Sequence, residues 1–245
     1  MSIHRIEILG VPVDCVNWSS ALGEVRRILR ESNGPATVIA VNPEKVMQAR
    51  ENPELLRRLR AASMLIPDGI GVVWAAKFLG LGRMERVPGS EMMPAICEIA
   101  AAGGHGVFLF GANSEVNAKA ANKLIGRYPL LRIVGQQDGY VSDAETPALI
   151  ERINESQAEI LFVALGSPKQ EIWMEQNLHR LNIKLCQGVG GTFDVIAGTV
   201  KRAPRLFLAL NLEWLYRVIT NPRRIKRQLA LPNFAWKVIC AKLMK

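Results

Sequence analysis

Asp68 occupies a position in the sequence that suits a general base. It follows the short apolar segment 64–66 and Pro67, and it precedes Gly69. We expect an apolar segment of this kind to be a strand that ends at Asp68, which puts a carboxylate at the mouth of a sheet. A carboxylate in that place can take a proton from a hydroxyl group. Asp-Gly is also a common turn signature, and an ordinary turn stays open as the alternative.

A second candidate site is the turn GSPKQE, residues 166–171. The apolar run 160–165 precedes it and a helical pattern follows it, so we expect a buried strand, a tight turn and a helix N-terminus. Backbone N–H groups at a helix N-terminus lack partners within the helix and suit an anion or a sugar. Lys169 and Gln170 add a charge and an amide donor. The alternative is a strand-to-helix connection with a solvated first turn.

A third feature is the glycine-rich segment GVGG, residues 188–191. Glycine there allows close backbone approach to a ligand or to another strand. The segment is not the G-x-G-x-x-G fingerprint, and the chain has no G-x-x-x-x-G-K-[ST] loop, which opposes a nicotinamide-dependent oxidoreductase and a nucleoside triphosphatase. The chain has no Asp-x-Asp pair, so a diphosphate site built on a chelated metal is not expected.

The elements that must position these residues follow an alternating pattern. Apolar segments end at turns and are followed by helical periodicity, and Asn42 and Pro43 form one such helix start as N-cap and first residue. This series predicts an α/β fold, with a Rossmann-like parallel sheet core flanked by helices and ligands at the carboxyl ends of the strands. The expected strands are 6–13, 36–41, 64–66, 107–110, 132–135, 160–165 and 184–187.

The positive charge is concentrated at the C-terminal end of the chain. Residues 201–245 hold eleven Lys or Arg and one acid, whereas residues 1–200 hold 20 basic and 21 acidic residues. We therefore predict a catalytic core over 1–200, with a division into 1–67 and 68–200 left open, and a basic helical appendage over 201–245. Pro222 and Pro232 are expected to break its helices. Its Trp and Phe residues suit an anionic bilayer surface, and a solvated basic face is the alternative.

Cysteine and histidine usage agrees with a reduced compartment and no metal. The four cysteines form no C-x-x-C pair, and the three histidines lack metal-ligand spacing. We expect buried thiols, a cytoplasmic location and no signal peptide. No apolar run approaches the roughly 20 residues that span a bilayer.

The chain contains, in this order, VNPEKVMQARENPELLRRL, LIPDGIGVV, RVPGSEM, GSPKQE, GVGGTFDVIAGTVKRAP and LEWLYRVITNPRRIKRQL. Together these segments, spread over about residues 8–231, resemble the WecG/TagA/CpsF family of bacterial glycosyltransferases. The resemblance implies an inverting, metal-independent transferase without cofactors. Such an enzyme moves N-acetylmannosamine from a UDP-sugar to polyprenyl-diphosphate-linked N-acetylglucosamine in teichoic acid or cell-surface polysaccharide synthesis. UDP-N-acetylmannosaminuronic acid and UDP-glucose are the alternative donors.

The resemblance also implies roles for individual residues. Asp68 matches the catalytic base, and Arg86 and Gln170 match positions that bind the donor. Ala40 stands where some members have Thr, so acceptor or sugar choice is expected to differ if that hydroxyl touches substrate. We also assign three residues to substrate binding, namely Asn42, Gly190 and Gly191. Three arginines of the appendage are expected to fold over the site and bind the diphosphate: Arg217, Arg224 and Arg227.

The implied partners are a UDP-sugar donor, a polyprenyl-diphosphate-linked acceptor and the anionic inner face of the cell membrane. We expect a peripheral cytoplasmic protein that binds no nucleic acid, and we leave self-association into a homo-oligomer open. The competing class is a non-catalytic basic module that binds nucleic acid or a membrane surface.

Overall fold

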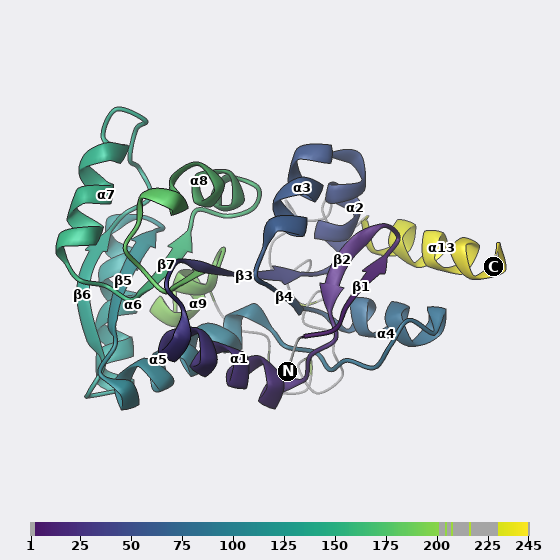
Figure 1. Cartoon of the computed structure of the whole chain (residues 1–245), viewed down its shortest axis with the longest axis horizontal. Coiled ribbons are helices and arrows are strands. Elements are labelled where there is room, and N and C mark those ends of the chain that lie inside the picture. The colour runs from purple at the N-terminus through teal and green to yellow at the C-terminus, as the bar shows by residue number, and fades with distance from the viewer. Residues whose placement is uncertain (1–2, 201–203, 205–206, 208–215, 217–229, 245) are drawn as a thin grey trace.

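The computed structural model describes residues 3–200, 204, 207, 216 and 230–244. In this part of the chain a six-stranded parallel sheet has helices on both faces, as predicted (Figure 1). The strand order is β4-β3-β8-β7-β5-β6. The strands are β3 (Ala36–Val41), β4 (Met64–Pro67), β5 (Gly106–Gly111), β6 (Arg132–Gln137), β7 (Ile160–Ala164) and β8 (Leu185–Gly188).

Alternate residues of the strands build two separate apolar layers. In β5, for example, Phe108 and Phe110 belong to one layer, whereas Val107 and Leu109 belong to the other. The first layer is covered by α2 (Pro43–Glu51), α3 (Pro53–Ala61), α4 (Ile70–Leu79), α7 (Thr146–Glu155) and α8 (Lys169–Asn177), which runs on into the short η1 (Leu178–Arg180). The second layer is covered by α1 (Trp18–Glu31), α5 (Gly89–Gly103), α6 (Ser114–Arg127) and α9 (Thr192–Ala197).

The expected single strand over residues 6–13 is instead a hairpin. β1 (Arg5–Ile8) pairs antiparallel with β2 (Val11–Asp14). The two residues between them, Leu9 and Gly10, have φ of 53° and 82°, and positive φ at both central positions is typical of the tightest hairpin turns. Pro12 lies inside β2. A two-stranded ribbon consists of edge strands, where a missing N–H is tolerated.

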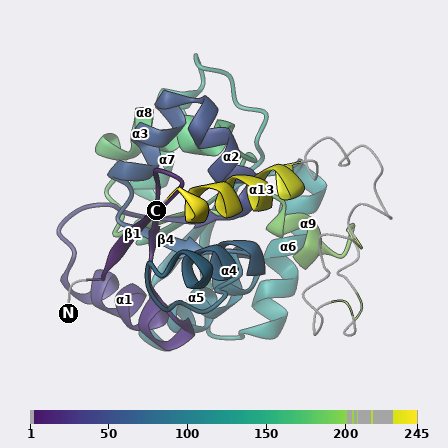
Figure 2. The same ribbon diagram turned by 90° about the vertical axis from the view of Figure 1, so that its right-hand side faces the viewer.

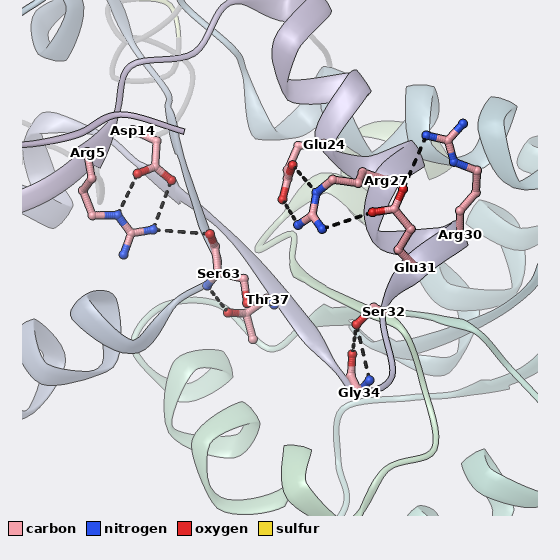
Figure 3. Close-up of polar contacts among 10 residues, drawn as sticks. All are labelled: Arg5, Asp14, Glu24, Arg27, Arg30, Glu31, Ser32, Gly34, Thr37 and Ser63. Atoms are coloured by element: carbon pink, nitrogen blue, oxygen red, sulfur yellow. Dashed lines mark hydrogen bonds and ion pairs between the residues drawn. The ribbon is translucent and has the colours of Figure 1, made fainter. Parts of the chain in front are cut away.

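A buried carboxylate ties this hairpin to the main sheet. Asp14, only 1% exposed, accepts hydrogen bonds from Arg5 Nε at 2.7 Å and from the backbone N–H of Leu65 in β4 at 2.7 Å. Figure 3 shows Arg5 and Asp14 beside the reciprocal bonds, both 3.0 Å, by which Thr37 and Ser63 join the starts of β3 and β4. These contacts fix β4, the strand that Asp68 directly follows.

The last described helix, α13 (Ala230–Leu243), packs on the core. Its Phe234 and Val238 are 2% and 0% exposed within the first apolar layer. Both views place α13 beside α4 at one end of the molecule (Figures 1 and 2). Pro232 does not break this helix, contrary to expectation, because it lies in the first turn, where its missing N–H has no helical partner to lose.

The division of the chain at residue 200 stays a prediction. Among the helices of the described residues, none combines the length and the apolar character that crossing a bilayer requires.

Candidate functional site

Asp68 lies at the carboxyl end of β4, as the sequence predicts. Its backbone N–H donates to the Val41 carbonyl at 2.8 Å, which continues the pairing of β4 with β3 by one residue. The side chain is half-buried, and a Cβ placed on Gly89 would lie 3.7 Å from Asp68 Oδ2. The carboxylate therefore sits beside the first residue of α5.

Gly69 gives the chain the sharp turn that follows Asp68. Its φ of 105° and ψ of 139° fall in a region that side-chain-bearing residues avoid. The chain then enters α4, and a Cβ on Gly71 would lie 2.7 Å from Pro43 Cγ. Glycine at both positions lets the start of α4 press against the start of α2, so Asp68 and Asn42 end adjacent strands side by side.

Asn42 is the N-cap of α2. Its Oδ1 accepts the backbone N–H of Lys45 at 2.8 Å, and Pro43 occupies the first helical position. The cap uses the side-chain oxygen and leaves the amide nitrogen of Asn42 as the group that a substrate could meet. Its assignment to substrate binding stays a prediction.

Arg86 belongs to the segment 80–88 that joins α4 to α5. Its neighbours anchor the main chain on both sides, since Glu85 N donates to Val16 O at 3.0 Å and Val87 N donates to Pro67 O at 2.8 Å. The second of these bonds places half-buried Arg86 next to the end of β4. The structure thus groups Arg86 with Asp68 and Asn42, and its role in donor binding stays a prediction.

The GSPKQE segment forms the predicted turn and helix start between β7 and α8. Gly166 has φ of 75°, the Ser167–Pro168 peptide bond is cis, and the N–H of Gln170 donates to the Gly166 carbonyl at 2.9 Å. Lys169 is exposed, whereas Gln170 and Glu171 are 3% and 2% exposed. The first turn is therefore not uniformly solvated.

Both ends of the Gln170 amide are engaged by the protein. Nε2 donates to Glu171 Oε1 at 3.1 Å, and Oε1 accepts the backbone N–H of Gly190 at 3.0 Å. By accepting the N–H of Gly190, Gln170 holds the loop that follows β8 in place. Whether it also touches the donor sugar stays a prediction.

The glycines at the end of β8 and directly after it serve this arrangement in different ways. A Cβ on Gly188 would lie 2.7 Å from Gln170 Nε2, so glycine makes room for that side chain. Gly190, with φ of 54°, faces open space, and Gly191 is exposed. The sequence left open a close approach to a ligand or to another strand, but the close neighbour of Gly188 is the Gln170 side chain of helix α8. Substrate binding by Gly190 and Gly191 stays a prediction.

A buried ion pair that the sequence analysis missed connects the two halves of the site. Lys45 Nζ in α2 lies 2.5 Å from Glu171 Oε1 in α8, and the two side chains are 8% and 0% exposed. Burial raises the pKa of Glu171, but the Lys45 ammonium and nearby hydrogen bonds outweigh it and hold that pKa below the ordinary value. The available signal was helical spacing, since positions 170, 171, 174 and 177 share the buried side of α8.

All these groups lie at one edge of the sheet. β3 runs between β4 and β8, so the carboxyl ends that carry Asn42, Asp68 and Gly190 are consecutive. In the described portion, no three His, Cys, Asp or Glu side chains gather as metal ligands would; metal independence stays a prediction. Three predicted site residues lie outside the described residues: Arg217, Arg224 and Arg227.

The edge therefore offers a carboxylate, an arginine and exposed backbone groups around glycine, which suits transfer of a group to a hydroxyl. The model of the glycosyl transferase WecG/TagA/CpsF family matches residues 6–245. A curated relative, the N-acetylglucosaminyldiphosphoundecaprenol N-acetyl-beta-D-mannosaminyltransferase of Bacillus spizizenii, is 35% identical over 209 residues, or 85% of this chain and 80% of the relative. The expected resemblance is confirmed, and the chain belongs to the WecG/TagA/CpsF family of glycosyl transferases.

Proposed function

We propose that the protein transfers N-acetylmannosamine from a UDP-sugar to N-acetylglucosamine carried on a polyprenyl diphosphate. The main support is the relative, whose name states an N-acetylmannosaminyl transfer to N-acetylglucosaminyldiphosphoundecaprenol. The placement of Asp68 at the carboxyl edge of the sheet, beside Arg86, supports the same chemistry. UDP-N-acetylmannosaminuronic acid and UDP-glucose remain the alternative donors within this proposal.

The proposed reaction is a direct displacement with inversion at C1 of the donor sugar. Asp68 takes the proton of the acceptor hydroxyl, whose oxygen forms the new bond to C1 as the bond from C1 to the UDP oxygen breaks. UDP leaves with the bonding electrons, and the proton stays on Asp68 until it passes to water. The step requires no metal in this proposal.

The negative charge of the leaving diphosphate must be stabilised by cations and N–H donors. Arg86 is the described candidate, because a guanidinium can pair with two phosphate oxygens at once. Gly190 and Gly191 would let the donor approach the backbone closely. We assign the remaining diphosphate charge to Arg217, Arg224 and Arg227, which would also help to exclude water from the sugar nucleotide.

We place the reaction at the inner face of the cell membrane, on a peripheral protein. The proposed acceptor is held in a bilayer by its polyprenyl chain, and the eleven basic residues of 201–245 would favour an anionic surface.

The decisive experiment is donor-dependent release of UDP. Wild-type protein is supplied with a panel of UDP-sugars and with a synthetic lipid-diphosphate N-acetylglucosamine acceptor. We expect release with UDP-N-acetylmannosamine, and only when the acceptor is present. If only another UDP-sugar were turned over, that sugar would replace N-acetylmannosamine as the proposed donor. If no UDP-sugar were turned over, the proposed function would be refuted.

Asp68→Asn tests the base. We expect turnover to fall by about 10²–10⁴-fold, with binding of the UDP-sugar retained in calorimetry. Asp143→Asn is the matched control, because Asp143 is an exposed aspartate outside the site, and it should leave turnover unchanged. Near-normal turnover of Asp68→Asn would exclude this carboxylate as the base.

A further inference from the structure

The outward face of α4 is apolar. Ile70, Trp74 and Phe78 are spaced four residues apart and are 42%, 39% and 38% exposed, so they form one stripe along the helix. The rings of Trp74 and Phe78 stack, with centroids 5.1 Å apart and an interplanar angle of 17°. Single exposed apolar residues are ordinary, but a stacked aromatic stripe on a surface helix indicates a contact.

The neighbouring helix, α13, is apolar on two opposite sides. One side is buried through Phe234 and Val238. On the other, Trp236, Ile239 and Leu243 are spaced three and four residues apart and are 65%, 37% and 80% exposed. A surface helix normally turns a polar face towards solvent. The outer side of α13 is unusual because it carries these three apolar residues instead.

The two helices lie side by side, and α4 begins next to the proposed catalytic base. α13 packs against α4 and α2, and a Cβ on Gly71 would lie 3.9 Å from the ring of Phe234. Figure 2 shows both helices at the end of the molecule that faces the viewer. Ile70 stands only two residues after Asp68. We name this region the α4–α13 surface, with the members Ile70, Trp74, Phe78, Trp236, Ile239 and Leu243.

The charged residues within the two segments that carry this surface have one sign. From 69 to 84 the charged residues are Lys77 and Arg83, and from 230 to 244 they are Lys237 and Lys242; neither stretch contains an acid. Aromatic residues with flanking lysines are the pattern of segments that lie in the headgroup region of an anionic bilayer. Two copies of this surface placed face to face would oppose cation to cation, which argues against a second copy as the occupant.

We propose that the α4–α13 surface docks on an anionic lipid bilayer and brings Asp68 close to the membrane. This inference rests on the proposed lipid-linked acceptor, and it assigns membrane contact to α4 within the core as well as to the C-terminal end of the chain. The exposed rings enter the headgroup layer while Lys77 and Lys237 meet lipid phosphates. The acceptor then reaches Asp68 without its polyprenyl chain leaving the bilayer.

The test is co-sedimentation of the full chain with vesicles that contain phosphatidylglycerol, compared with vesicles of phosphatidylcholine alone. Trp74→Ser/Phe78→Ser should lower the partition coefficient for the anionic vesicles by about tenfold or more, since it removes two apolar anchors. Ile125→Ser/Leu130→Ser is the matched control, because these residues are 43% and 75% exposed but belong to α6 and the loop after it. The control should bind as wild type does.

Lys77→Glu/Lys237→Glu is a second variant that leaves the aromatic residues in place. It should weaken binding to phosphatidylglycerol vesicles and leave the small affinity for phosphatidylcholine unchanged. Unaltered binding of both double variants would overturn the proposal. So would a change of oligomeric state in lipid-free buffer with vesicle binding unaltered, which would assign the surface to a second copy.

A short-chain, water-soluble acceptor separates this inference from the proposed function. Trp74→Ser/Phe78→Ser should turn over the soluble acceptor as wild type does and lose activity only towards acceptor embedded in vesicles. If wild type turns over neither acceptor, the proposed function fails, while the vesicle measurements still decide whether the surface binds a bilayer. Equal loss towards both acceptors would place the stripe in the active site and refute its role in docking.

Discussion

Lys45 Nζ and Glu171 Oε1 lie 2.5 Å apart in the interior, although 126 residues separate them in sequence. Lys45 is in the first turn of α2, whose N-cap is Asn42, and Glu171 is in the first turn of α8. Glu171 also accepts from Gln170, which holds the N–H of Gly190. One chain of polar contacts therefore joins the carboxyl end of β3 to that of β8, so both sides of the site share a single support.

Breaking the pair should be costly for stability. Lys45→Met leaves the Glu171 carboxylate buried without its cation, and we expect the free energy of unfolding to fall by about 3–5 kcal/mol. Urea denaturation followed by circular dichroism measures this change. Lys119→Met is the matched control, because Lys119 and Glu115 form an exposed pair at the same 2.5 Å, and its effect should be undetectable. A small loss for Lys45→Met would show that the pair contributes little.

The pair also predicts a pH dependence. The pKa of Glu171 is lower in the folded protein than its ordinary value, so the unfolded chain binds the proton more readily. The stabilisation from this carboxylate is complete above the unfolded pKa of about 4.3 and is lost as pH falls through the folded value. The difference in unfolding free energy between wild type and Glu171→Gln should stay constant from pH 8 to 6 and shrink below about pH 5. A difference that is flat down to pH 3 would contradict this assignment.

Gln170 and Gly188 should depend on each other. A Cβ on Gly188 would lie 2.7 Å from Gln170 Nε2, so Gly188→Ala must displace the side chain that holds Gly190. We expect Gly188→Ala alone to reduce turnover and stability. The same change should lower the free energy of unfolding by less in a Gln170→Ala background, where the Gln170 side chain no longer fills the space. A double-mutant cycle should give a coupling energy of about 1 kcal/mol or more. Additive effects would show that Gln170 does not hold the loop through this contact.

The sequence predicted the strands of the sheet well because each is a short apolar run closed by a turn. β5 and β7, for example, were expected at 107–110 and 160–165 and are found at Gly106–Gly111 and Ile160–Ala164. The hairpin of β1 and β2 was missed because its turn begins with Leu9, a residue that seldom adopts positive φ. Local pattern gave no sign that the chain reversed there.

The site was only partly predictable for a different reason. Asp68, Asn42 and Gly190 stand at strand ends, and a parallel sheet brings such ends to one edge. A solvated first helical turn was the alternative left open for GSPKQE, yet Gln170 and Glu171 are buried. Their burial depends on Lys45, which arrives from a distant helix, and no local pattern reports a partner so far away in sequence. Charge pairing across the core overrode the usual relation between polarity and exposure.

Gly69 should be the most sensitive backbone position next to Asp68. Its φ of 105° and ψ of 139° are open to glycine, so Gly69→Ala should destabilise the fold by about 1–3 kcal/mol. It should also reduce turnover further than that loss explains, because any relief of strain rotates the peptide that joins residue 69 to Asp68. Gly23→Ala is the matched control: Gly23 lies within α1, and a Cβ added there would meet nothing within 4 Å. That change should stabilise the protein by about 0.4–1 kcal/mol and leave turnover unchanged.

Thermal unfolding and UDP release at a temperature where both variants are folded would measure the two effects separately. If Gly69→Ala lost stability but kept full turnover, the turn at Gly69 would stabilise the fold without positioning the Asp68 carboxylate.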